Sequence, residues 1–138
     1  MTPTRLQSRR ALALVPAGWG IAVALLLTLI PGPADMDGTT LGFVVWNLIP
    51  HAALVIIVLE TSAHAPQTWP ALAVGVGANA VVTAVALGSF LFDEGSTGAL
   101  VFLFLPAYLI ALVVATAIAA GITYAVRSPR PRPVRAPQ

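Results

Sequence analysis

The chain has 138 residues, of which 58% are hydrophobic and 9% are charged, and its mean hydropathy is +0.90. These values are typical of an integral membrane protein and exclude a soluble enzyme with an α/β core or a disordered tail protein. The absence of cysteine excludes a disulfide-stapled secreted module. The apolar residues fall into four blocks, each of about the 20 residues that a helix needs to cross a bilayer.

The four blocks predict an all-α fold, an integral membrane four-helix bundle made of two helical hairpins. The transmembrane domain is expected at 11–126, with its four helices at about 11–30, 41–60, 71–92 and 99–125. A basic N-terminal segment, 1–10, precedes it, and an arginine- and proline-rich segment, 127–138, follows it. Because proline stands at almost every second position of the last segment, we expect a disordered tail there.

The charges predict the orientation in the membrane. All seven basic residues are arginines at the two ends of the chain, whereas the first and third connections carry four acids: Asp35, Asp37, Asp93 and Glu94. Arginines that flank apolar segments are retained on the cytoplasmic side. We therefore expect both termini in the cytoplasm, with lipid headgroups in contact with the arginines nearest the helices: Arg9, Arg10, Arg127 and Arg130.

The composition also predicts a location. Arginine without lysine, in a chain rich in alanine and proline, is associated with GC-rich bacterial genomes, so we expect the bacterial cytoplasmic membrane. The isoelectric point of about 9.9 would also suit a protein that binds nucleic acid. Arginines divided between two ends beside membrane helices fit anionic headgroups better, so the expected partner is the lipid bilayer and no nucleic acid.

His51 is the most informative residue, because it lies near the middle of the second block and an ionisable side chain at that depth indicates a functional site. Asn47 lies one turn earlier, on the same face of the helix. Pro50 has no N–H and cannot donate to the carbonyl of Trp46. Together with Pro106 in the fourth block, it predicts a helix bend.

The third and fourth blocks add polar side chains at a depth similar to that of His51. The candidate intramembrane polar site consists of His51, Asn47, Asn79, Thr83 and Tyr108. Two interpretations are open. The site can be a cavity for a proton, a water chain or a ligand, or its groups can join the helices by hydrogen bonds worth about 0.6 kcal/mol each. The sequence favours the second interpretation.

No catalytic site can be assembled from the residues inside the membrane. They offer no Ser/His/Asp set, no paired carboxylates and no group of metal ligands, since His51 has no second ionisable group on its part of any helix. We therefore expect no enzymatic activity, no metal and no cofactor.

Small residues recur every four positions in the last two blocks: Ala80, Ala84 and Gly88, and then Ala107, Ala111, Ala115 and Ala119. Stripes of this kind let helices approach closely. They favour packing of the third helix against the fourth and leave open a homo-oligomer or a larger membrane complex.

A weak internal repeat appears at an offset of 56 residues, which pairs Val45 with Val101, Pro50 with Pro106 and Val58 with Val114, and places Trp46 on Phe102. Parallel repeats related by an axis along the membrane normal occur in transporters. The alternative is that the two halves are unrelated and that these identities between apolar segments arose by chance.

The segment 42–51, which reads Gly-Phe-Val-Val-Trp-Asn-Leu-Ile-Pro-His, precedes a run of leucine and valine. It resembles the second helix of a family of small four-helix bacterial membrane proteins, over about a quarter of the chain. The resemblance implies the four-helix fold and brings no known activity. A small multidrug transporter would need a glutamate in the first helix, and residues 11–30 contain no acid. A small flippase-like glycolipid protein stays open by fold analogy.

The sequence is compatible with two functions of different classes. The sequence favours a non-enzymatic accessory or scaffold component of the membrane, because small-residue faces and short connections are present without a catalytic set. The alternative is a small transporter or channel-like protein that works through His51 and Asn47.

Overall fold

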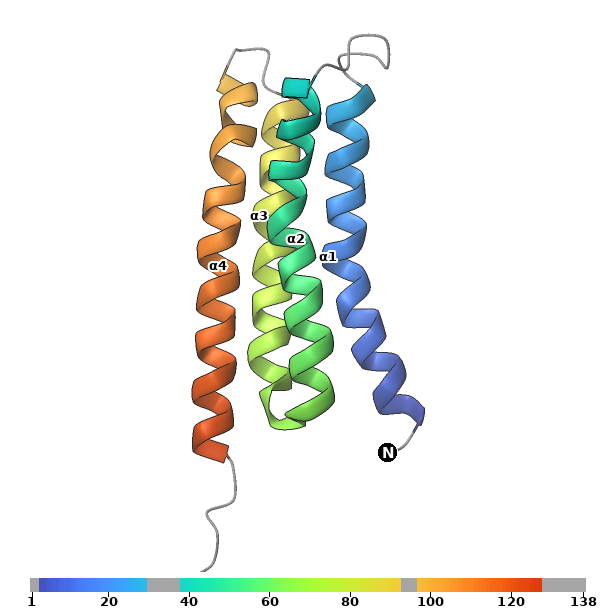
Figure 1. Cartoon of the computed structure of the whole chain (residues 1–138), viewed down its shortest axis with the longest axis vertical. Coiled ribbons are helices and arrows are strands. Elements are labelled where there is room, and N and C mark those ends of the chain that lie inside the picture. The colour runs from blue at the N-terminus through green and yellow to red at the C-terminus, as the bar shows by residue number, and fades with distance from the viewer. Residues whose placement is uncertain (1–2, 30–37, 93–96, 128–138) are drawn as a thin grey trace, which may run out of the picture.

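A computed structural model of the chain describes residues 3–29, 38–92 and 97–127. This part contains no strand and consists of four α-helices and one short 3₁₀ helix: α1 (Pro3–Leu29), α2 (Gly38–His64), η2 (Pro66–Thr68), α3 (Trp69–Phe92) and α4 (Thr97–Arg127). The predicted all-α four-helix bundle is confirmed (Figure 1).

All four α-helices are apolar and long enough to cross a membrane, with suitable windows from 18 residues in α1 to 27 in α4. Large apolar side chains cover the outside of the bundle, among them Ile21, Ile56, Val74, Leu91 and Ile118. Such a surface is costly in water and is expected where the solvent is lipid. The chain is therefore a multi-pass membrane protein.

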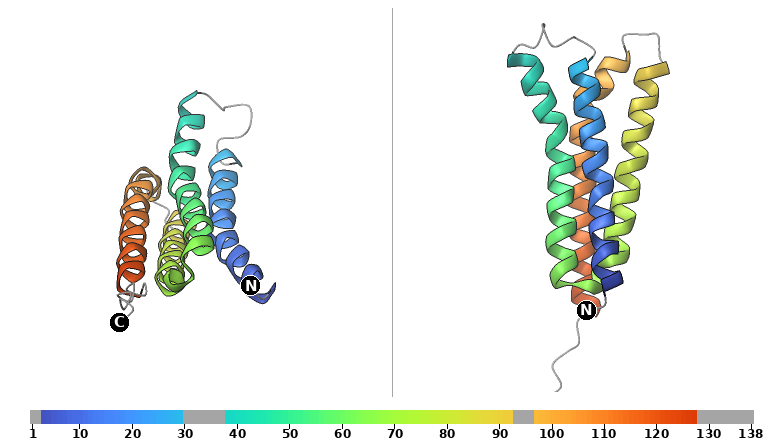
Figure 2. Two further views of the ribbon diagram at one scale, coloured as in Figure 1. Left: turned by 60° about the horizontal axis from the view of Figure 1, so that its bottom comes forward. Right: turned by 90° about the vertical axis from the view of Figure 1, so that its right-hand side faces the viewer.

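The four helices form a ring in the order α1, α2, α4, α3. Each helix packs against its two neighbours in this ring, and the closest pairs are the two hairpins, α1 with α2 and α3 with α4. The diagonal pair α2 and α3 makes few contacts. In the right-hand view of Figure 2, α1 lies in front and α4 behind, with α2 and α3 on opposite sides.

This ring order does not fit a two-fold axis along the bundle. Such an axis would place α1 diagonally opposite α3, and α2 opposite α4, whereas both pairs are neighbours. Two of the residue pairs related by the 56-residue offset also differ in environment. Trp46 is exposed and Phe102 is buried, whereas Val58 is buried and Val114 is exposed. The arrangement of the hairpins is therefore not the parallel repeat that the offset indicates.

The helices are longer than the apolar blocks. α1 begins at Pro3, so the basic segment with Arg9 and Arg10 continues into the membrane helix. Proline suits the first position of a helix, where its missing N–H costs nothing. Pro50 and Pro106 lie inside continuous helices and are buried, as is Pro16 in α1.

Arg127 is the last residue of α4 and is exposed. Arg130, the expected tail and the four acids of the two connections lie outside the described residues. The helices place the start of α1 and the end of α4 at the same end of the bundle, called here the lower end (Figure 1).

The predicted packing of the third helix against the fourth is confirmed, but the alanine stripe of α4 is not part of that contact. Its members, Ala107, Ala111, Ala115 and Ala119, are all exposed on the outer surface. The contact between α3 and α4 forms through other residues, in particular Gly75, whose backbone lies directly against the side chain of Thr116. The stripe is a smooth outer face of the bundle.

The η2 turn closes the lower end by joining the diagonal helices α2 and α3. Ala65 and Thr68 are buried in this connection, and η2 also contacts α4. The Thr68 hydroxyl donates a 2.6 Å hydrogen bond to the Ala65 carbonyl, which also accepts a 3.0 Å bond from the Thr68 N–H. The connection is thus a packed part of the bundle.

Candidate functional site

The core of the bundle is divided into two apolar layers. The lower layer contains Ala13, Leu54, Val58, Leu72, Val76, Val113 and Ala120. The upper layer contains Val23, Ala86, Phe102, Leu105 and Leu109. Along α2 and α3 the residues between these layers are polar: Asn47, His51, Asn79 and Thr83. We call these four residues the polar layer, and all four are buried.

α2 contributes His51 and Asn47 to the polar layer. His51 is the fourteenth of the 27 residues of α2 and its side chain is 2% exposed. Asn47, one turn above, donates a 2.9 Å hydrogen bond from Nδ2 to the Phe43 carbonyl of its own helix. The two side chains share the inner face of α2, because residues four apart lie on one face of a helix.

α3 contributes Asn79 and Thr83, which are also four residues apart and are both fully buried. The Thr83 hydroxyl donates a 2.8 Å hydrogen bond to the Asn79 carbonyl. This bond satisfies the hydroxyl within its own helix, so it does not join α3 to a neighbour. The Asn79 amide is left as the group of α3 that can bind something other than its own backbone.

The other two helices form apolar walls at this level. On α1, a Cβ atom at Gly20 would lie 3.1 Å from the His51 Cβ atom, so the α1 backbone lies directly against the base of the histidine side chain. On α4, Leu109 and Val113 occupy the corresponding turn and are buried. The polar groups of α2 and α3 therefore face each other across the bundle axis between apolar walls.

Five buried polar atoms of this layer have no hydrogen-bond partner in the described structure: Asn47 Oδ1, His51 Nδ1 and Nε2, and Asn79 Nδ2 and Oδ1. The His51 ring and the Asn79 amide approach closely enough to interact. The two groups do not reach hydrogen-bond geometry, so both keep unpartnered polar atoms. Buried polar atoms in proteins are otherwise nearly always paired, so these five indicate a site for a further hydrogen-bonding group.

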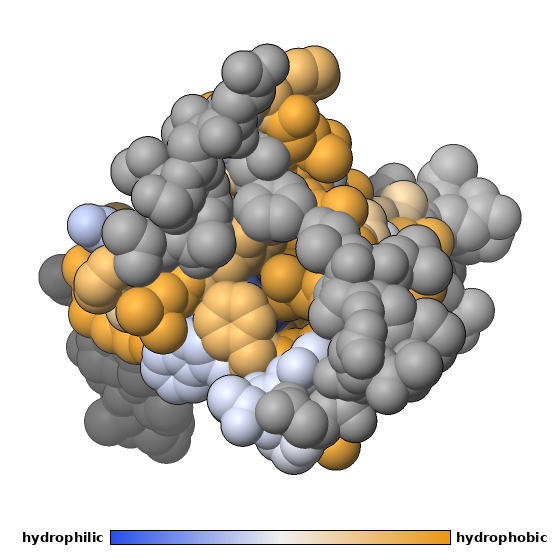
Figure 3. All heavy atoms as spheres, turned by 90° about the horizontal axis from the view of Figure 1, so that it is seen from above, coloured by the Kyte–Doolittle hydropathy of each residue, from blue (hydrophilic) through white to orange (hydrophobic). Residues whose placement is uncertain are grey.

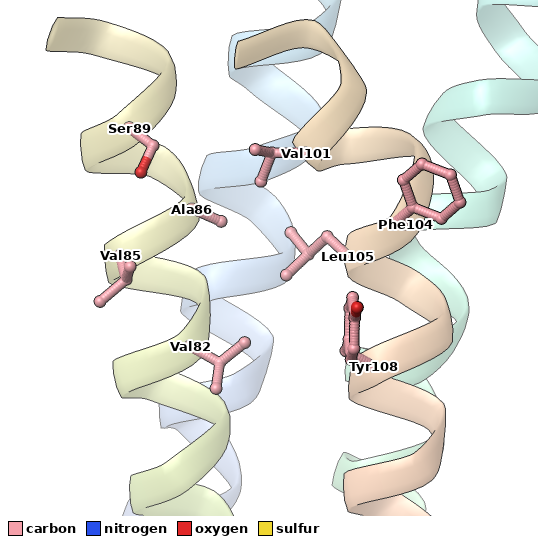
Figure 4. A pocket seen from close by; sticks show the side chains of 8 residues that line it. All are labelled: Val82, Val85, Ala86, Ser89, Val101, Phe104, Leu105 and Tyr108. Atoms are coloured by element: carbon pink, nitrogen blue, oxygen red, sulfur yellow. The ribbon is translucent and has the colours of Figure 1, made fainter. Parts of the chain in front are cut away.

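Tyr108 does not belong to this site, contrary to the expectation from its depth. Its side chain is 71% exposed and lines a lateral groove of about 410 Å³ between α3 and α4 (Figure 4). The groove is bordered mainly by apolar residues, with Ser89 and Tyr108 as its hydroxyl-bearing members. None of the four residues of the polar layer lines this groove.

Sequence reasoning missed two positions that shape the site. Gly20 sets the distance between α1 and His51, and Gly75 sets that between α3 and Thr116, one turn below Asn79. A glycine in an apolar helix gives no sign of which residue it faces, so its role appears only when the helices are packed. Thr116 is also buried, with its hydroxyl bonded to the Leu112 carbonyl at 2.8 Å.

Seen from the upper end, the described surface is mostly apolar, and a small hydrophilic spot is visible between the apolar side chains (Figure 3). The part of the chain that the structure describes contains no group of three or more histidine, aspartate or glutamate residues that could hold a metal ion. No known protein family, curated protein or solved structure matches the chain.

Proposed function

We propose that this membrane protein is a small transporter or channel-like protein that works, without enzymatic chemistry, through the polar layer. The observation that carries the proposal is the set of five buried polar atoms without partners at the centre of the bundle. A purely structural role would require these groups to bond across helices. Asn47 and Thr83 instead bond to their own helices, and His51 and Asn79 complete no bond.

The position of the site also supports transport. The polar layer lies at mid-depth with one apolar layer above it and one below. Apolar constrictions that open and close are a known means of gating passage through a membrane protein. A buried polar centre between two such layers fits a site that is reached from one side at a time.

We place the protein in the bacterial cytoplasmic membrane with both termini inside. The helix ends support this orientation, because Arg9, Arg10 and Arg127 belong to the lower ends of α1 and α4. Arginines beside membrane helices favour the cytoplasmic face and its anionic lipid.

The test is a flux measurement with purified protein in lipid vesicles. The parent protein should give a protein-dependent flux of protons, water or a small solute, and His51→Gln should abolish it while expression and folding stay normal. Tyr108→Phe is the matched control, since Tyr108 lies outside the polar layer, and should retain the flux. Absence of any protein-dependent flux in the parent would overturn the proposal.

An accessory or scaffold role is the second candidate, and the exposed alanine stripe of α4 favours it. Small residues on a lipid-facing helix permit close approach of another helix, from a second copy or from a partner protein. Purification in mild detergent should then retain a bound partner, and Ala111→Leu should release it. A monomer without partners would remove the support for this role.

A further inference from the structure

We infer that the polar layer is an internal hydration site, which binds water and excludes ions. This inference deepens the proposed function, because it names the class of species that the same site takes. It rests on three properties of the site: the types of its free hydrogen-bonding atoms, the absence of charge around it, and its enclosure.

The free atoms of the polar layer require a ligand that both donates and accepts hydrogen bonds. A neutral imidazole offers one donor and one acceptor, and the Asn79 amide offers two donors and an acceptor oxygen. Asn47 Oδ1 adds a further acceptor. A metal cation would leave the donors unsatisfied, and an anion would leave the acceptors unsatisfied. Water satisfies both, and a buried water typically makes about three such bonds.

The surroundings carry no countercharge for an ion. Within the described residues between 11 and 126, Glu60 is the one aspartate, glutamate, lysine or arginine. It lies nine residues along α2 from His51, which corresponds to about 13 Å of helix. It is also exposed at the lower end of the bundle. An ion without a paired charge at this depth is strongly disfavoured, whereas an uncharged molecule is not.

The walls enclose the polar layer closely. The α1 backbone lies against the His51 side chain, with Gly20 at the contact. Apolar layers close the site above and below, with Leu54 beneath it and Leu105 above it among their members. The His51, Asn47 and Asn79 side chains are themselves at most 2% exposed. A molecule the size of water fits such an enclosure better than a larger solute.

The first experiment detects the water directly and does not depend on transport. The protein is labelled with ¹⁵N in the histidine rings and reconstituted in lipid nanodiscs. The signals of its two histidines are assigned with a His64→Gln variant. We expect transfer of magnetisation from water to the His51 ring N–H, and its loss in Asn79→Leu. A folded parent protein whose His51 ring shows no contact with water would overturn the inference, whatever the behaviour of the variant.

The second experiment separates this inference from the proposed function. Vesicles with the parent protein are tested for osmotic water permeability and, separately, for K⁺ and Cl⁻ flux. We expect faster osmotic shrinkage than with Asn79→Leu and no flux of either ion, with Tyr108→Phe behaving as the parent. A hydrated His51 without any flux would refute transport and leave the hydration site standing. A K⁺ or Cl⁻ flux that disappears in Asn79→Leu would refute the inference and leave transport standing.

Discussion

Gly75 of α3 is packed so closely against α4 that a single added methyl group has no room. A Cβ atom at this position would overlap the Thr116 side chain, including its Cβ atom, which is attached directly to the α4 backbone. Gly75→Ala should therefore force the two helices apart and lower the free energy of unfolding by about 1 to 3 kcal/mol, as overpacked cores do. Unfolding by denaturant in detergent micelles measures this change.

Gly77 provides a matched control two residues along the same helix. It is exposed, and an added Cβ atom there meets nothing within 4 Å. Gly77→Ala should be neutral or stabilise the helix by up to about 1 kcal/mol, because alanine is the better helix former. Equal unfolding of the two variants would show that the contact between Gly75 and Thr116 is not a tight one.

At the residue scale, the sequence predicts how deep a residue lies in the membrane better than it predicts which side of the helix faces the core. Asn47 and His51 are four residues apart, and this spacing predicts that they share a face of the helix. Depth alone predicts that Asn79 and Thr83 join them, and the structure buries both. Tyr108 was placed by depth alone. α4 is apolar on all sides, so no polar stripe shows which face is inward. Its neighbour Leu109 is buried, and Tyr108, about 100° away around the helix, is exposed.

The short η2 connection allows a test at the scale of an element. Thr68→Val removes the hydroxyl that donates to the Ala65 carbonyl at 2.6 Å and keeps the shape of the fully buried side chain. Loss of one buried hydrogen bond should cost about 1 kcal/mol of stability. Thr123→Val is the control, since its hydroxyl bonds to the Ala119 carbonyl of its own helix on the exposed surface. Thermal unfolding in micelles should separate the two variants, and identical midpoints would contradict a stabilising role for η2.

The number of helices and the packing within each hairpin follow from the sequence, but the arrangement of the two hairpins relative to each other does not. Four long apolar blocks specify four crossings, because a crossing helix must satisfy its own backbone hydrogen bonds. Which helices pack together depends on small differences in shape among apolar faces. The diagonal position of α2 and α3 and the outward alanine stripe of α4 have no signature in composition or spacing. They result from close contacts such as those at Gly20 and Gly75.

On the scale of the whole molecule, the distribution of charge and the direction of the helices distinguish the same two ends of the bundle. The lower end carries the arginine-bearing ends of α1 and α4 and the packed η2 turn, and the upper end carries the start of α2. The polar layer lies between them, separated from each end by an apolar layer. The orientation of the bundle therefore decides which of the two apolar layers separates the polar layer from the cytoplasm.

Single cysteines can report the orientation cleanly, because the chain contains no native cysteine. In intact cells, cysteines at Gly38 and Ser96 should react with a membrane-impermeant maleimide, whereas those at Ser8 and Ser128 should react only after the cells are opened. The physical reason is the retention of flanking arginines on the cytoplasmic side. Labelling of Ser8→Cys and Ser128→Cys in intact cells, with protection of Gly38→Cys and Ser96→Cys, would invert the topology. The upper apolar layer would then be the barrier between the polar layer and the cytoplasm.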